Sequence, residues 1–339
     1  MPGQINCATD QMQHTKEGKM SAEVKISVPG LFAAAGAGIA FSVIDMIFKF
    51  LSGDYPLYEV VLFRSIIAVC VMLAVIVPLE GGYHLLRTHQ PKLHFARCFV
   101  VFFANICFFT GLTLLPLAEA VAIAFATPLI VTALSALFLG ERPGPWRWGA
   151  VCAGFLGVLI IMRPGAGTFQ AAAILPLLGA CGYATLHVLT RHAGGSEAGA
   201  TLAFYPMMGF LILSALAGLI FGDGRFATGG SPALDFILRA WIWPAPEDWP
   251  YLIGVGIAGS AGGYLVSQAY RMNEAALAAP FEYIAMPMSV LWGVLIFNEW
   301  PDLPVWLGSG LIIASGLVSV WRETRRNRPA PRPRPRAEG

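Results

Sequence analysis

Charged side chains are scarce in this chain. Only 12% of its 339 residues are Asp, Glu, Lys or Arg, whereas 56% are hydrophobic. A soluble domain carries roughly 25% charged residues, so this chain has too few to cover a surface that faces water. The composition predicts an integral membrane protein whose partners are the lipid bilayer and a small molecule, with no nucleic acid.

Cysteine pairs and nucleotide-binding loops are also lacking. The six cysteines stand singly: Cys7, Cys70, Cys98, Cys107, Cys152 and Cys181. No CxxC or Cys/His metal spacing occurs, so we expect no disulfide framework, no metal site and no cofactor. The absence of a Walker A sequence indicates that this chain does not itself use ATP as a driving force. Residues 1–27 are polar and lack the apolar core of a secretory signal, which makes Met20 an alternative start.

One pattern occurs twice: two apolar runs joined by a short polar elbow. Residues 115–165 and 273–322 align on that elbow, where Glu141 falls on Glu299 and Trp148 falls on Trp306. An internal repeat of this kind reveals the architecture of a chain. It predicts two related halves, 28–165 and 166–321, that each end in the same helical hairpin.

The apolar runs are long enough to cross a bilayer, which takes about 20 residues per helix. Ten segments qualify: 29–51, 57–79, 95–115, 118–139, 146–162, 170–190, 198–221, 249–269, 275–297 and 304–321. Five helices per half is an odd number, so the second half is inverted relative to the first. The sequence therefore predicts an all-α integral membrane protein with ten transmembrane helices in two inverted five-helix repeats.

Basic residues set the expected orientation. With both termini inside, 17 of the 22 Lys and Arg residues face the cytoplasm, as the excess of positive charge on the inner side requires. We expect a multi-pass protein of the cell (inner) membrane with a cytoplasmic N-terminus. The Arg/Pro-rich tail, 322–339, is expected to be a disordered cytoplasmic segment.

Three groups of residues resemble the drug/metabolite transporter superfamily, in its ten-helix form with two EamA domains. They are the hairpin ends LFLGERPGPWRWGAVCAGFLGV and LIFNEWPDLPVWLGSGLIIASG, the segment FSVIDMIFKFLSGDYPLYEVVLFRS (Phe41–Ser65), and APFEY (Ala279–Tyr283). The last two resemble a branch that includes S-adenosylmethionine and riboflavin carriers. The resemblance covers about 28–321 and implies a permease that moves a small metabolite. It leaves the substrate open, because the family also moves amino acids, nucleotide derivatives and drugs.

Ionisable residues inside the membrane are the first candidates for the site, since each costs about 2.5–3.5 kcal/mol even on the mild insertion scale. Asp45 and Lys49 share one face of the first helix. Arg64, on the second helix, is expected near the level of Asp45, and Glu59 near that of Lys49. We expect the pairs Asp45–Arg64 and Lys49–Glu59 to line the outer half of the pathway. The alternative is that they only fix the first helix to the second.

Glu282 is the strongest candidate for coupling. It lies about eight residues into the ninth helix with no basic neighbour in sequence, and an unpaired buried carboxyl takes up a proton readily. It would couple transport to protons or bind a cationic group. The alternative is a protonated Glu282 that Tyr283 satisfies through a hydrogen bond.

Further polar side chains at membrane depth are secondary candidates, because such residues more often join helices than bind ligands. They are Asn105, Tyr183, Tyr264 and Gln268. Glu119 begins the fourth helix at the outer rim, where the helix N-terminus stabilises an acid.

The function expected from these features is secondary transport by alternating access, proton-coupled or by exchange. Inverted repeats place a substrate site at their interface and support that mechanism. Uptake of a vitamin or nucleoside-like cofactor is favoured slightly over export of amino acids, drugs or toxic metabolites. A membrane-embedded enzyme is a remote alternative, because no catalytic constellation accompanies Ser260, Ser309 or His187. Gly-rich helix faces are compatible with a homodimer.

Overall fold

The computed structural model is helical throughout the residues that it describes, which are 27–138, 144–163, 171–192, 197, 199–227, 230–272 and 283–326. The first half contains α2 (Val28–Leu51), α3 (Leu57–Val71), η1 (Met72–Ile76), α4 (Val77–Glu80), η2 (Tyr83–Leu86), α5 (Pro91–Leu114), α6 (Leu117–Ala124), α7 (Thr127–Phe138) and α8 (Pro145–Met162). The second half contains η3 (Ala171–Ala173), α9 (Ile174–His192), α10 (Gly199–Phe221), α11 (Pro232–Leu238), α12 (Trp249–Met272), α14 (Ala285–Phe297) and α15 (Leu303–Arg326).

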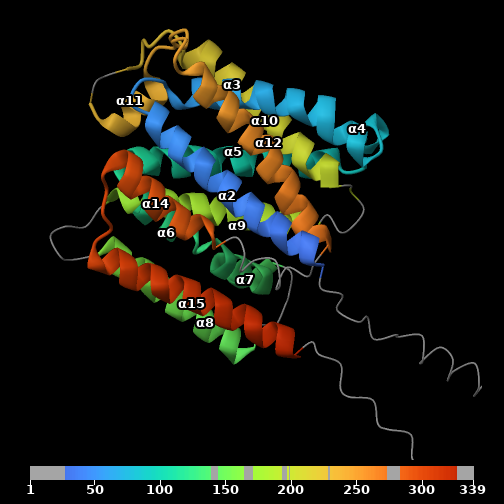
Figure 1. The fold of residues 1–339 in the computed structure, drawn as a ribbon, viewed down its shortest axis with the longest axis vertical. Helices are drawn as coiled ribbons and strands as arrows, with labels where there is room; N and C mark the ends of the chain where they lie inside the picture. Colours follow the sequence, from blue (N-terminus) through green and yellow to red (C-terminus); the bar gives the residue numbers. More distant parts are fainter. Residues whose placement is uncertain are drawn as a thin grey trace, which may run out of the picture.

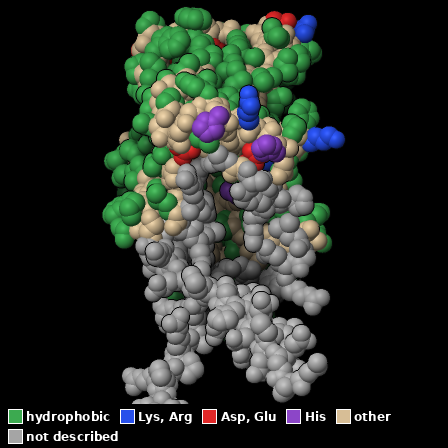
Figure 2. Space-filling model, turned by 90° about the vertical axis from the view of Figure 1, so that its right-hand side faces the viewer, with side chains coloured by type: hydrophobic (Ala, Val, Ile, Leu, Met, Phe, Trp, Pro, Cys, Tyr) green, Lys and Arg blue, Asp and Glu red, His purple; other side chains and the backbone are tan. Residues whose placement is uncertain are grey.

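Within the described residues, six helical segments are long and apolar enough to cross a membrane, and three shorter apolar helices accompany them. Large apolar side chains cover the outside of the bundle, as in Leu79, Leu219 and Phe32, which are 80%, 83% and 74% exposed. Apolar side chains also fill the upper part of the view in Figure 2. Lipid is the solvent that such a surface requires, so the chain is a multi-pass membrane protein.

The observed helix limits follow the expected spans, with two differences. The helix α5 begins at Pro91 instead of residue 95, because proline is well suited to the first turn of a helix. The helix α15 continues to Arg326, five residues past the expected end at 321. The remainder of the predicted tail, 327–339, lies outside the described residues, as do residues 1–26.

Prolines divide two of the expected spans. The fourth expected helix is interrupted between α6 and α7, just before Pro128, because proline has no N–H to donate to the carbonyl four residues earlier. That freed carbonyl belongs to Ala124, and the hydroxyl of Thr127 donates to it at 2.7 Å. Similarly, the π-helical segment η1 precedes Pro78 in the second span.

Pro206 lies inside α10 and frees the carbonyl of Leu202. The guanidinium of Arg97, from α5, donates to that carbonyl at 3.3 Å. A buried arginine of the first half thus satisfies a free backbone carbonyl in the second half. This contact joins the two halves near the start of α10.

The helices pack in pairs that the expected inverted repeat explains. α2 packs on α12 as α9 packs on α5, and α2 packs on α14 as α9 packs on α7. Three further pairs, α3 with α10, α6 with α14 and α8 with α15, each join one helix to its counterpart in the other half. In Figure 1 the pair α8 and α15 lies at one edge of the molecule, α3 and α10 lie at the opposite edge, and α2, α9, α6 and α14 lie between them.

The pair α8 and α15 meets at two glycines. A Cβ atom built on Gly157 would lie 2.7 Å from the carbonyl oxygen of Gly308, and one built on Gly308 would lie 2.6 Å from that of Gly157. Only residues without side chains allow two backbones this close. These glycines therefore set the separation of the two hairpin helices.

Candidate functional site

Four of the predicted site residues meet in the middle of the bundle, each from a different helix. Asp45 comes from α2 and Arg64 from α3, and the two charges interact electrostatically. Tyr183, from α9, also interacts with the Arg64 charge. The amide of Asn105, from α5, donates to the hydroxyl of Tyr183 at 2.8 Å. Residues of both halves therefore contribute to one polar cluster, which we call the central cluster.

Aromatic rings hold the guanidinium of Arg64. Its Cζ atom lies 4.9 Å from the ring centroid of Phe210, 5.2 Å from that of Phe48 and 6.0 Å from that of Phe109. Phe48 and Phe109 are stacked on each other at 3.9 Å. The negative faces of aromatic rings attract a cation, so these rings fix the orientation of Arg64, which forms no ion pair with a carboxylate of the described residues.

The carboxylate of Asp45 has no hydrogen-bond or ion-pair partner among the residues that the structure describes, and its side chain is partly exposed to solvent. Tyr183 is also partly exposed, and His187, one turn further along α9, is exposed. These side chains face an accessible space within the bundle. We call the end at which α2 begins and α15 ends the inner end. Figure 2 views the molecule from that side.

Lys49 does not pair with Glu59, so that prediction was wrong. The ammonium group of Lys49 lies 2.7 Å and 2.9 Å from the two carboxylate oxygens of Glu299, in the elbow between α14 and α15. It also donates to the carbonyl of Leu115 at 2.7 Å. Glu59 instead accepts the backbone N–H of Ile242 at 3.3 Å. The spacing of residues along two helices predicted a shared depth, but it could not reveal that a third element lies nearer.

Glu299 also accepts the backbone N–H of Leu117, at the start of α6, at 2.9 Å. One carboxylate therefore joins α2, the α5–α6 junction and the elbow of the second half. These groups lie at the end of the bundle opposite the inner end, which we call the outer end. The contact between Lys49 and Glu299, named here the outer latch, holds the two halves together there.

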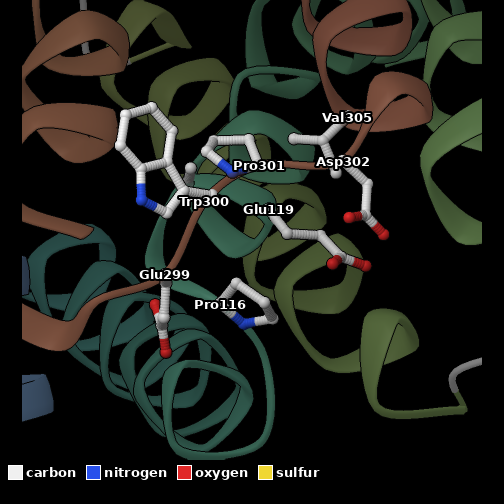
Figure 3. A pocket seen from close by; sticks show the side chains of 8 residues that line it. Pro116, Glu119, Glu299, Trp300, Pro301, Asp302 and Val305 are labelled. Carbon is white, nitrogen blue, oxygen red and sulfur yellow. The ribbon is translucent and has the colours of Figure 1, made fainter. Parts of the chain in front are cut away.

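A small pocket of about 100 Å³ lies beside the outer latch (Figure 3). Its lining residues are Pro116, Ala118, Glu119, Glu299, Trp300, Pro301, Asp302 and Val305. Sequence reasoning explained Glu119 by its helix N-terminus alone and gave no role to Glu299. The alignment of Glu299 with Glu141 was the signal that could have drawn attention to it.

The remaining predicted residues are spread through the molecule. Gln268 donates to Glu80 at 2.6 Å, away from the central cluster, and Tyr264 packs in a cluster of apolar residues around Met72. Tyr283 is buried, with its ring 5.1 Å from that of Phe125. Glu282 lies outside the described residues, and so does Glu141.

Sequence reasoning missed a polar cluster at the inner end. Glu197, between α9 and α10, accepts the hydroxyl of Thr88 at 2.8 Å and the backbone N–H of His89 at 3.0 Å. Burial raises the pKa of this carboxyl, but these two hydrogen bonds and the nearby histidines outweigh burial, and the net pKa lies below the ordinary value. The ring of His94 stacks on that of Tyr205 at 4.3 Å beside it.

The features described so far define a membrane carrier. They are an inverted helical repeat, a polar cluster with residues from both halves, and an accessible interior. The comparison with known families identifies which kind. The EamA-like transporter family matches residues 28–163 and again residues 170–321, and the chain belongs to that family. The resemblance inferred from the hairpin motifs is thereby confirmed, and the chain is a transporter as opposed to an enzyme.

Several characterised relatives align over nearly all of the chain. A riboflavin transporter of Rhizobium johnstonii is 28% identical over 94% of this chain and 99% of its own length. An S-adenosylmethionine uptake transporter of Rickettsia conorii is 26% identical over 85% of this chain and 90% of its own. A pseudopaline exporter of Pseudomonas aeruginosa is 27% identical over 84% and 94%. A solved crystal structure matches with a TM-score of 0.60 over 86% of this chain and 98% of its own, at 20% identity, which shows the fold alone.

Proposed function

We propose that this protein is a secondary transporter that takes up a small, planar, polar metabolite, of the vitamin or nucleoside-like cofactor class. The observation that carries the proposal is the carboxylate of Asp45, which is accessible and without a direct partner in the described residues, beside an Arg64 held among three rings. A binding site is typically apolar with a few polar groups that fix orientation. The central cluster has that composition.

The chemistry of the cluster suits a heteroaromatic ring. Asp45 accepts hydrogen bonds from ring N–H or amino groups, and Arg64 donates to ring carbonyls or nitrogens. The hydroxyl of Tyr183 is held by the Asn105 amide and adds another polar contact. The rings that pack on Arg64, with Phe102 beside them, offer flat apolar surfaces. The riboflavin and S-adenosylmethionine carriers among the relatives support this class of substrate.

Alternating access follows from the two ends of the bundle. The outer latch joins the halves at one end, and Asp45 and Tyr183 of the central cluster are partly exposed to solvent. We infer that breaking the outer latch, together with closure near the inner end, exposes the cluster to the opposite side. The count of basic residues supports an inner end that faces the cytoplasm, with both termini there.

Coupling is assigned to Glu282 as a proposal from sequence. The carboxyl of Glu282, two residues after Pro280 in an apolar segment, would exchange a proton during each transport cycle. Export is the second candidate direction, because the pseudopaline exporter aligns over the same length of the chain as the uptake carriers.

The test is counterflow in proteoliposomes with riboflavin, S-adenosylmethionine, nucleosides and amino acids, with and without a pH gradient. Asp45→Asn should abolish the exchange of any substrate that the wild type moves. Asp54→Asn, an exposed carboxylate three residues past the end of α2, is the matched control and should leave exchange unchanged. Equal exchange by wild type and Asp45→Asn would refute the central cluster as the binding site.

The coupling role is tested in the same assay. Glu282→Gln should remove the dependence of exchange on the pH gradient, and an unchanged dependence would exclude Glu282 from coupling.

A further inference from the structure

The pocket at the outer end contains an excess of negative charge. Three carboxylates line it: Glu119, Glu299 and Asp302. Two of them are paired, because Glu299 binds Lys49 at 2.7 Å and Asp302 binds Arg163 at 3.0 Å. The third, Glu119, has no hydrogen-bond or ion-pair partner in the part of the chain that the structure describes. Three carboxylates therefore share the two cations Lys49 and Arg163, which leaves one negative charge in excess.

Glu119 is nevertheless only 4% exposed. The helix N-terminus and the two nearby cations stabilise its charge, but no described residue donates a hydrogen bond to it, so its carboxylate is available to a ligand with N–H donors. Figure 3 shows that Glu119 and Asp302 turn their carboxylates the same way, whereas Glu299 points away from them. The charges of Arg163 and Lys49 act favourably on Glu119, and that of Asp302 acts unfavourably. Glu119 thus faces a space in which negative charge is concentrated.

The size and rim of this space limit the ligand. Its volume of about 100 Å³ exceeds the ~10–15 Å³ that one water molecule requires, so it admits a small polar group. Trp300 lines it with an indole that is 74% exposed, and an aromatic face attracts a cation. A primary ammonium group donates N–H hydrogen bonds to carboxylates such as those that line this space, whereas a quaternary ammonium has no N–H to donate.

We propose that this pocket is an outer binding site for the primary ammonium end of a small organic cation, with Glu119 as its main anionic contact. The role of the site, though not its existence, depends on the proposed function. An ammonium group in the pocket competes with Lys49 for Glu299, which lines the pocket and forms the outer latch. Substrates that carry a primary amine would therefore favour opening of the outer end as they arrive.

The site is tested by saturation-transfer NMR of methylammonium with the full chain in lipid nanodiscs. The wild type should transfer saturation to the methyl protons, and Glu119→Gln should reduce this signal at least fivefold. Glu247→Gln removes an exposed carboxylate just before α12 and should leave the signal unchanged. Glu119→Asp keeps the charge and should keep most of the signal.

Three outcomes would overturn the proposal. They are no transfer in the wild type, equal transfer in Glu119→Gln, and displacement of methylammonium by equimolar choline or sodium chloride, which would indicate screening or a site for inorganic ions. If Glu119→Gln does not fold, Trp300→Ala replaces it, since this exposed side chain is tolerant of change, and the signal should fall by about half. The NMR signal does not depend on transport, so its failure is distinct from a failure of Asp45→Asn to block counterflow.

Discussion

At the scale of single residues, the setting of Arg64 predicts that its shape matters as much as its charge. Lys is a compact point charge that lacks the planar, stacking guanidinium. Arg64→Lys should keep the protein folded and raise the KM for uptake about tenfold, since ~1.4 kcal/mol corresponds to a factor of ten. The measurement is initial uptake rate against substrate concentration in proteoliposomes.

The matched control for Arg64→Lys is Arg225→Lys. Arg225 also lies over an aromatic ring, with its Cζ atom 4.9 Å from the centroid of Phe226, but its side chain is 60% exposed in a loop. Uptake by this variant should match the wild type. An unchanged KM in both variants would show that Arg64 contributes only a charge.

Glu197 predicts how stability depends on pH. Its pKa in the folded protein lies below the ordinary value, despite burial, because Thr88 and the backbone N–H of His89 hydrogen-bond the charged form. The charged Glu197 therefore stabilises the folded protein. This stabilisation is complete above the ordinary pKa of a Glu, about 4.3, and is lost as pH falls through the lower pKa that Glu197 has in the folded protein. Glu197→Gln should therefore lower the melting temperature at pH 7, by a few degrees for ~1–2 kcal/mol, and the difference should shrink at pH 3.

Thermal unfolding in detergent, followed by tryptophan fluorescence at both pH values, measures this difference. Glu247→Gln, which removes an exposed carboxylate, serves as the control and should show little change at either pH. A melting difference for Glu197→Gln that persists undiminished at pH 3 would contradict the assigned role of the charge.

The sequence predicted part of the site at this scale. Helix geometry placed Asp45 and Arg64 at a similar depth, and their charges do interact, although the two side chains form no direct ion pair. The same reasoning failed for Lys49, whose partner Glu299 is 250 positions away. Depth along a helix can be read from spacing, whereas the direction in which a side chain points depends on how the helices pack. Glu282 stays a prediction.

At the scale of helices, the crossing of α8 and α15 predicts a sharp contrast between two glycines of one helix. Gly308→Ala would place a Cβ atom 2.5 Å from Cγ1 of Ile161, which forces the helices apart. Gly310→Ala, two residues further along α15, meets nothing within 4 Å. We expect Gly308→Ala to lower the melting temperature by several degrees, at a cost of about 1–3 kcal/mol for overpacking, and Gly310→Ala to change it little.

Melting of both variants, purified in the same detergent, provides the measurement. Equal melting temperatures would mean that α8 and α15 separate without strain. The Gly-rich character of these helices was visible in sequence, but which glycine lies at the crossing was not. The break between α6 and α7 was similarly hidden within an apolar run, although Pro128 marks its place.

At the scale of the whole molecule, the pairing of helices across the two halves is what the proposed alternating access of one binding site requires. The repeat was predictable because the two elbows and the residues after them align. The pairing itself was not, since α2 with α12 and α9 with α5 are contacts between distant parts of the chain. The structure supplies the asymmetry that alternating access needs, because the described outer latch joins the halves at one end.

The outer latch predicts which change alone would expose the outer end. Lys49→Met removes the ammonium group that joins α2 to Glu299 and to the carbonyl of Leu115, so the state closed at the outer end loses a charge-assisted contact. Ala118 lines the outer pocket and is 3% exposed. A cysteine placed there should react with a membrane-impermeant maleimide added outside whole cells several times faster in Lys49→Met than with Lys49 intact.

The control is Lys92→Met, which removes an exposed lysine at the start of α5 and should leave the labelling rate unchanged. Mass spectrometry of the peptide that contains position 118 separates this reaction from that of the native cysteines. A rate unaffected by Lys49→Met would show that the latch does not control opening, and a reaction that requires permeabilised cells would reverse the orientation inferred from the basic residues.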